Sequence, residues 1–103
     1  MKVKMTAFAK QQICEIAKYI HEEFGKKYSD NFLGKVKKTK RNLVNNPHLG
    51  PEEPLLSDLP NHYRSIVVNN LNKMVYYIDD NSTIYIVDFW DVRREPRILS
   101  NRI

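Results

Sequence analysis

The residues best suited to binding chemistry form a cluster of three arginines within five positions, namely Arg93, Arg94 and Arg97. A guanidinium group presents a planar fork of donors that can hold a phosphate or a carboxylate through two bonds at once. Pro96 restricts the backbone inside the cluster and so helps to hold it in place. The cluster predicts a site for an anionic ligand. The arginines could instead form a structural network with nearby acidic residues, namely Asp88, Asp91 and Glu95.

The overall charge also favours an anionic partner. The chain has 103 residues, and its 17 Lys and Arg against 12 Asp and Glu give a formal net charge of +5 and a pI of about 9.4. Such an excess favours binding to nucleic acid or to an acidic protein segment, although it also fits a solvated basic surface that aids solubility. The length predicts one domain over residues 1–103.

The sequence carries no signal for export or for a membrane. Its longest uncharged apolar run has only the length of a strand, and the basic N-terminus is followed by no apolar signal core. The single cysteine, Cys14, cannot form an internal disulfide, which fits a reducing compartment. We therefore expect a cytoplasmic protein without membrane contact.

Two helices are expected in the first half of the chain. Thr6 is a suitable N-cap for the first helix, and Gly25 is expected to end it. The apolar positions of this helix recur at three- and four-residue spacing: Ala9, Ile13, Ile16, Ala17, Ile20 and Phe24. Ser29 is expected to cap the second helix, which should end before Pro47 because the residue preceding a proline avoids the helical conformation. Its apolar stripe is Phe32, Val36, Thr39 and Leu43.

Three strands are expected in the second half, where the period changes to two. Residues 63–69, 73–79 and 83–91 are rich in Val, Ile, Tyr and Phe, as strands are. Turn-forming residues at 70–72 and 80–82 predict that both connections are hairpins. These segments therefore predict an antiparallel meander.

The two remaining segments complete the expected fold. Residues 3–5 alternate and could form a short opening strand, and residues 48–61 contain prolines without a period, which predicts a loop. The order is a short N-terminal strand, an α-helical hairpin and then a three-stranded antiparallel meander. This order predicts an α+β domain with the helices packed on one face of the sheet.

Strict alternation would divide the meander into two faces. The face expected to receive the helices is nearly all apolar: Tyr63, Ser65, Val67, Met74, Tyr76, Ile78, Tyr85, Val87 and Phe89. The opposite face mixes apolar and charged side chains: Arg64, Ile66, Val68, Lys73, Val75, Tyr77, Ile84, Ile86, Asp88 and Trp90. An apolar outer face edged by charge is typical of a binding surface. It could also be covered by the C-terminal segment or by a dimer partner.

Four segments together resemble the RelE/ParE toxin superfamily, which includes plasmid stabilisation proteins. They are residues 63–68 (YRSIVV), 73–78 (KMVYYI), 90–96 (WDVRREP) and the loop at 47–50, and the resemblance covers essentially the whole chain. It implies the toxin of a type II toxin–antitoxin system, held inactive when a cognate antitoxin wraps around it. RelE-like toxins cut messenger RNA in the ribosomal A site, whereas ParE-like toxins inhibit DNA gyrase.

The resemblance also implies roles for particular residues. Arg64 and Lys73 match basic residues on the active face of RelE-like nucleases, and Arg93 or Arg94 matches the arginine after the last strand. These cations could stabilise phosphate charge. However, Ile66 lies where RelE has a second lysine, and residues 97–103 lack the Tyr or His of RelE-like enzymes. No general acid or base is therefore identified.

These departures favour a ParE-like growth inhibitor that acts by binding DNA gyrase. The alternatives are a metal-independent, ribosome-dependent mRNA endonuclease that uses the cations above, and a non-toxic remnant that binds nucleic acid or only the antitoxin. We expect the protein partner to contact four residues near the last strand: Tyr77, Trp90, Asp91 and Arg97. No cofactor or metal is expected, because the three histidines are far apart and fit no zinc-ligand spacing.

Overall fold

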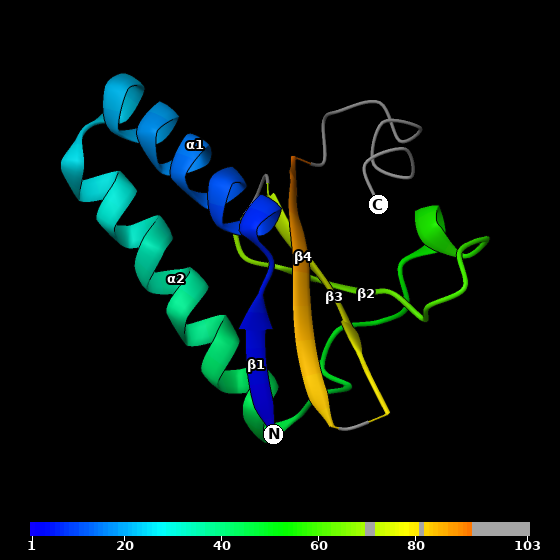
Figure 1. Cartoon of the computed structure of the whole chain (residues 1–103). Helices are drawn as coiled ribbons and strands as arrows, with labels where there is room; N and C mark the ends of the chain where they lie inside the picture. The colour runs from blue at the N-terminus through cyan, green and yellow to red at the C-terminus, as the bar shows by residue number, and fades with distance from the viewer. Residues whose placement is uncertain (70–71, 81, 92–103) are drawn as a thin grey trace.

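The computed structural model describes residues 1–69, 72–80 and 82–91 (Figure 1). The elements follow the predicted order: β1 (Lys2–Met5), α1 (Ala7–Phe24), α2 (Lys26–Asn45), the short 3-10 helix η1 (Pro54–Leu56), β2 (Arg64–Val67), β3 (Asn72–Ile78) and β4 (Thr83–Asp91). The α+β class is therefore confirmed.

The helical hairpin is set by its caps. Thr6 caps α1 as predicted, since its Oγ1 accepts a hydrogen bond from the backbone N–H of Ala9 at 3.1 Å. Gly25 ends α1 with a φ of 102°, a conformation that favours glycine. The predicted cap at Ser29 is wrong, because α2 begins at Lys26, directly after Gly25. Ser29 is buried inside the helix, where its hydroxyl donates to the backbone oxygen of Lys26.

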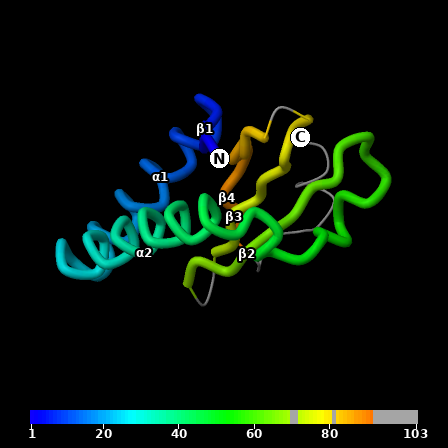
Figure 2. The backbone as a smooth tube through the Cα atoms, turned by 90° about the horizontal axis from the view of Figure 1, so that it is seen from below, coloured from blue at the N-terminus to red at the C-terminus, as the bar shows by residue number. Residues whose placement is uncertain are grey.

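The four strands form one mixed sheet in the order β1-β4-β3-β2. β1 pairs with β4 in parallel, whereas β2, β3 and β4 form the predicted antiparallel meander. The helical hairpin connects β1 to the rest of the sheet, and Figure 2 shows both helices on the same side of it. The prediction that the helices cover one sheet face is confirmed.

The predicted division of the sheet faces is wrong for β2 and for the first half of β4. A bulge interrupts the pairing of β3 with β4: Val75 pairs with Asp88 but Tyr76 pairs with Ile86, so Val87 is an extra residue in β4. Ile84 and Ile86 consequently face the helices. In the first hairpin, the N–H of Val68 donates to the oxygen of Asn72, and this closure turns Ile66 and Val68, not Tyr63, Ser65 and Val67, toward the helices.

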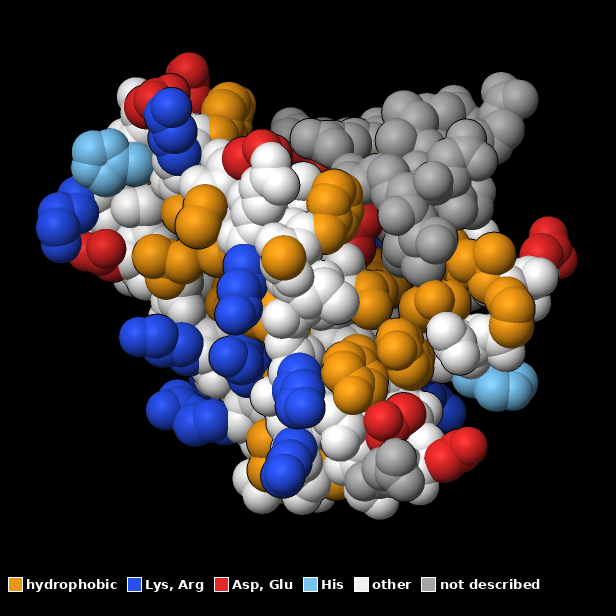
Figure 3. Space-filling model, viewed as in Figure 1, with side chains coloured by type: hydrophobic (Ala, Val, Ile, Leu, Met, Phe, Trp, Pro, Cys, Tyr) orange, Lys and Arg blue, Asp and Glu red, His pale blue; other side chains and the backbone are white. Residues whose placement is uncertain are grey.

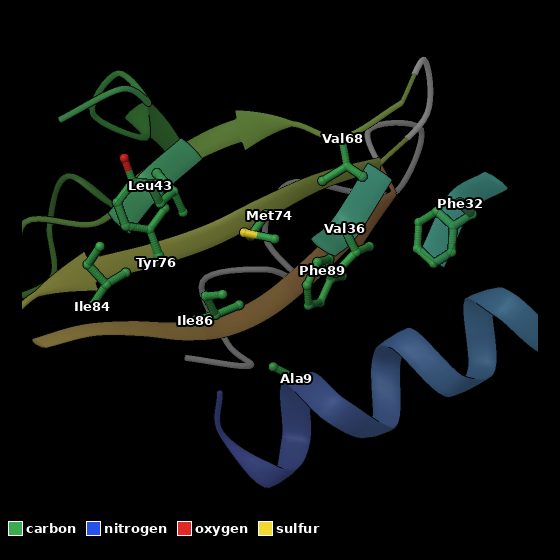
Figure 4. Close-up of a cluster of buried hydrophobic side chains, with 10 residues drawn as sticks. All are labelled: Ala9, Phe32, Val36, Leu43, Val68, Met74, Tyr76, Ile84, Ile86 and Phe89. Atoms are coloured by element: carbon green, nitrogen blue, oxygen red, sulfur yellow. The ribbon is translucent and has the colours of Figure 1, made fainter. Parts of the chain in front are cut away.

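The main core lies between the helices and this face of the sheet (Figure 4). Its buried members come from both helices and from the meander: Ala9, Phe32, Val36, Leu43, Val68, Met74, Tyr76, Ile84, Ile86 and Phe89. Figure 4 shows Met74, Ile86 and Phe89 on the strands pointing toward the helical side chains. This core accounts for the helix–sheet packing.

A second cluster lies on the outer face of the sheet. Leu56 from η1 packs against Val75 and Trp90, with Leu59 and Tyr63 alongside. We call residues 51–63 the covering loop, because they lie over this part of the sheet. The apolar centre of the outer face, predicted to be a binding surface, is thus covered by the chain itself.

Candidate functional site

The two predicted cations of the sheet, Arg64 and Lys73, both contact the segment around the covering loop. Arg64 begins β2, and its Nη1 donates to the backbone oxygen of Gly50 at 2.7 Å. The loop ends are fastened next to it, since the N–H of Ser65 donates to the oxygen of Pro51 and the N–H of Glu53 to the oxygen of Tyr63. Arg64 therefore helps to fix the entrance of the loop.

Lys73 forms an ion pair with Glu53 beneath the covering loop. The Lys73 side chain is 16% exposed and the Glu53 side chain only 1%. Burial lowers the pKa of the Lys73 ammonium from its ordinary value of 10.5. Glu53 also accepts a hydrogen bond from the N–H of Leu55 at the start of η1, so its carboxylate joins β3 to the loop. The sequence pattern gave no indication of Glu53, because the loop is aperiodic.

The residues predicted to bind a partner do not form one surface in the structure. Trp90 is 1% exposed and lies in the second cluster beneath the covering loop. Tyr77 lies on the outer face, with its ring centroid 5.5 Å from that of Tyr63 and 5.3 Å from that of Tyr85. Burial, with smaller effects of both tyrosines and of Asp79, raises the Tyr77 pKa above 10.0. Arg97, a third predicted partner contact, lies outside the described residues, as do Arg93 and Arg94, which were predicted to stabilise phosphate charge.

Asp91, the fourth residue predicted to contact a partner, lines a groove beside the helical hairpin. A groove of about 690 Å³ runs between α1, α2 and the neighbouring ends of β3 and β4. We call it the hairpin groove. Its lining is mainly apolar and aromatic with polar residues at the edges: Gln12, Glu15, Ile16, Tyr19, Ile20, Phe24, Tyr28, Asn31, Phe32, Lys35, Asn69, Asn72, Phe89 and Asp91.

Three aromatic rings on the wall of the hairpin groove are largely exposed. Tyr19, Phe24 and Tyr28 are 54%, 62% and 58% exposed, and their rings form an edge-to-face series with centroids 6.5 and 6.3 Å apart. Figure 3 shows hydrophobic side chains at the surface over the helical hairpin, beside Lys and Arg side chains. The spacing of α1 predicts Phe24 on its apolar stripe, but the side chain is exposed. Two further aromatics within five positions of Phe24 are the signal that could have indicated an exposed cluster.

This arrangement is suited to binding. An apolar groove with polar edges can hold an amphipathic segment of another protein. Within residues 1–69, 72–80 and 82–91, no group of three His, Cys, Asp or Glu side chains could hold a metal ion. None of the helices in this part of the chain is long and apolar enough to cross a membrane.

Several solved structures share the fold. The chromosomal ParDE toxin–antitoxin system of P. aeruginosa matches with a TM-score of 0.73 at 16% identity, over 90% of this chain and 97% of that chain. The YoeB/ParE toxin of Agrobacterium tumefaciens matches with a TM-score of 0.59 at 18% identity, over 88% and 98%. The E. coli DinJ-YafQ complex matches with a TM-score of 0.59 at 17% identity, over 87% and 91%. At these identities the likeness establishes the fold alone.

The family is established by the sequence. Comparison with curated proteins gives no significant match. The family model of the ParE toxin of the type II toxin–antitoxin system parDE, however, matches residues 3–96, which is nearly the whole chain. The chain therefore belongs to the ParE toxin family of type II toxin–antitoxin systems.

Proposed function

We propose that this type II toxin arrests growth by binding DNA gyrase and does not cut messenger RNA. The observation that carries the proposal is the ion pair between Lys73 and Glu53. A metal-independent ribonuclease needs cations that meet the developing charge on the phosphate, together with a proton donor and acceptor. Lys73 is nearly buried, and its charge is already balanced by a buried carboxylate.

Arg64 supports the same conclusion. One arm of its guanidinium donates to the backbone oxygen of Gly50, so the side chain has a structural role at the loop entrance. Both sheet cations that would hold the phosphate of a messenger RNA thus also serve to hold the covering loop. Binding requires no such free cations on the sheet, and we assign the contact with gyrase to the arginines after β4, Arg93, Arg94 and Arg97.

The gyrase proposal is tested by DNA supercoiling in vitro. Purified toxin should inhibit supercoiling by gyrase, and Arg94→Ala should weaken the inhibition at least tenfold without lowering Tm. Lys18→Ala, which removes a charge from an exposed position of α1, is the matched control and should inhibit like the wild type. Supercoiling that is unaffected by a molar excess of folded toxin would contradict the proposal.

The alternative activity is tested in cells. Primer extension on messages from cells that express the toxin should show no cuts in phase with codons. Codon-phased cuts that disappear in Arg64→Ala, with the fold intact, would replace gyrase binding by RNA cleavage. Growth that is unaffected by soluble, folded protein would instead identify a non-toxic remnant.

We further propose that the antitoxin occupies the hairpin groove. The exposed Tyr19, Phe24 and Tyr28 offer the apolar contact that an amphipathic segment requires, and Asp91 lies at the same groove. The outer face of the sheet is less suited to this role because the covering loop already occupies its apolar centre.

A further inference from the structure

Helix α2 has two opposite faces. The buried face carries residues at three- and four-residue spacing: Ser29, Phe32, Val36, Thr39 and Leu43. The rest of the helix is strongly basic, with seven cations: Lys26, Lys27, Lys35, Lys37, Lys38, Lys40 and Arg41. Against them stands one acidic residue, Asp30, which pairs with Lys26 at 2.6 Å. Within the described part of the chain, the other six cations of α2 form no ion pair.

Four of these cations lie on the side directly opposite the buried face. A turn of 100° per residue places Lys27, Lys37, Lys38 and Arg41 there, and all four are exposed. We call this side the basic face of α2. Figure 3 shows Lys and Arg side chains at the surface of the helical hairpin. From Lys27 to Arg41 the basic face extends about 21 Å along the helix axis, and three of its four cations lie in the second half of α2.

Gly34 lies at the centre of the basic face. Lys37 and Lys38 follow it by one turn, and Lys27 precedes it by two. The residue is exposed in the middle of α2, and a Cβ added to it would meet nothing within 4 Å. Neither packing nor an unusual backbone angle therefore requires glycine, which is less favourable than alanine inside a helix. Because glycine has no side chain, a ligand can approach the helix backbone closely at this point.

We propose that the basic face of α2 binds the phosphate backbone of double-stranded DNA, with Gly34 at the point of closest approach. Lysine is suited to phosphate contact as a compact charge, and phosphate contacts hold a protein on a duplex without reading its sequence. The face carries only Lys, Arg, Asn, Asp and Gly, so it lacks the aromatic rings on which single-stranded bases stack. The choice of DNA over RNA rests on the proposed gyrase target.

The proposal is tested by fluorescence anisotropy with a labelled 20-base-pair DNA duplex and the purified full chain, without gyrase. With about four phosphates contacted, the affinity should fall on the order of a hundredfold between 50 and 200 mM salt. The triple variant Lys37→Gln/Lys38→Gln/Arg41→Gln should bind at least tenfold more weakly. Its plot of log affinity against log salt should be less steep by about two to three units.

A matched triple variant distinguishes binding at the basic face from binding that depends only on the net charge of the protein. Lys2→Gln/Lys4→Gln/Lys10→Gln removes the same number of positive charges from exposed positions of β1 and α1, away from the basic face of α2. It should keep at least a third of the wild-type affinity and an unchanged salt dependence. Equal losses in the two triple variants would show that the charge acts only as a general field and would overturn the proposal. Tighter binding to an RNA duplex of the same sequence would overturn the choice of DNA.

Substitutions at Gly34 separate an effect on DNA binding from an effect on helix stability. Gly34→Ala should raise Tm, because alanine favours the helix, and Gly34→Gln should weaken DNA binding at least fivefold with the helix content unchanged. Wild-type affinity in Gly34→Gln would overturn the close approach. These measurements contain no gyrase, so their failure leaves the supercoiling test untouched. Intact DNA binding without gyrase inhibition would remove only the gyrase proposal.

Discussion

The hydroxyl of Tyr76 joins the core to the start of the covering loop. It donates to the backbone oxygen of Pro47 and accepts from the N–H of Gly50, both at 2.9 Å. Position 50 has to be glycine for this contact, because a Cβ there would lie 2.5 Å from the oxygen of Ser65 and 2.9 Å from the Tyr76 hydroxyl. The backbone oxygen of Gly50 accepts a hydrogen bond from Arg64, so this glycine bonds to both Tyr76 and Arg64.

Tyr76→Phe should lower the free energy of unfolding by about 1–3 kcal/mol, because it leaves the buried N–H of Gly50 without its acceptor. Burial raises the Tyr76 pKa above its ordinary value of 10.0, so the unfolded phenol ionises before the folded one. The stabilisation from this group is complete below pH 10 and is lost as the pH rises through the folded pKa. Urea unfolding at pH 7, 9, 10.5 and 11 measures both effects.

The wild type should accordingly lose stability above pH 10 more steeply than Tyr76→Phe. Tyr19→Phe changes an exposed tyrosine and should keep the wild-type profile. Parallel pH profiles for Tyr76→Phe and the wild type would contradict the assigned role of the hydroxyl.

At the scale of elements, the covering loop depends on the pair of Glu53 with Lys73. A buried ion pair adds little stability on balance, because removing two charges from water is costly. Breaking the pair is different, since it leaves one charge buried without a counterion. Glu53 is the more deeply buried partner, so removal of Lys73 should be the more harmful change.

We therefore expect Lys73→Met to lower the free energy of unfolding by about 3–5 kcal/mol at pH 7, as measured by urea unfolding. Adding Glu53→Gln should restore at least half of that loss, because the amide removes the unpaired charge. If the double variant is less stable than Lys73→Met, the ion pair does not explain how the loop is held.

Local signals predicted most of the elements. The helical spacing, the Thr6 cap and the glycine at position 25 depend on residues close in sequence, and the structure has each of them. The bulge at Val87 and the pairing of β1 with β4 depend on residues far apart in sequence. Strict alternation could not reveal the bulge, because one extra residue turns every earlier side chain in β4 to the other face.

The candidate site was predictable only by residue type. Arg64 and Lys73 could be selected as cations in strands, but their acceptors lie 14 and 20 residues away in an aperiodic loop. Free and paired cations look identical in a sequence. The exposed aromatics were missed because Phe24 continues the apolar spacing of α1, whereas its side chain is 62% exposed in the structure.

On the scale of the whole molecule, the helices and the outer sheet face offer separate surfaces. The hairpin groove lies between the helices and the ends of β3 and β4, whereas the covering loop lies on the opposite face of the sheet. In the proposed arrangement, the antitoxin segment gains affinity from apolar contacts in the groove that the target does not use. We therefore expect substitutions in the groove to weaken antitoxin binding without loss of gyrase inhibition.

Phe24→Ser combined with Tyr28→Ser should lower the affinity for the cognate antitoxin at least tenfold, because large exposed aromatics supply much of the energy of an interface. Isothermal titration calorimetry measures the affinity, and gyrase inhibition by the free variant should equal that of the wild type. Val67→Ser, which alters an exposed apolar residue of β2 outside the groove, should bind the antitoxin normally. Unchanged antitoxin affinity in the double variant would place the antitoxin elsewhere. Weakened gyrase inhibition would mean that inhibitor and target share the groove, and that neutralisation works by direct competition.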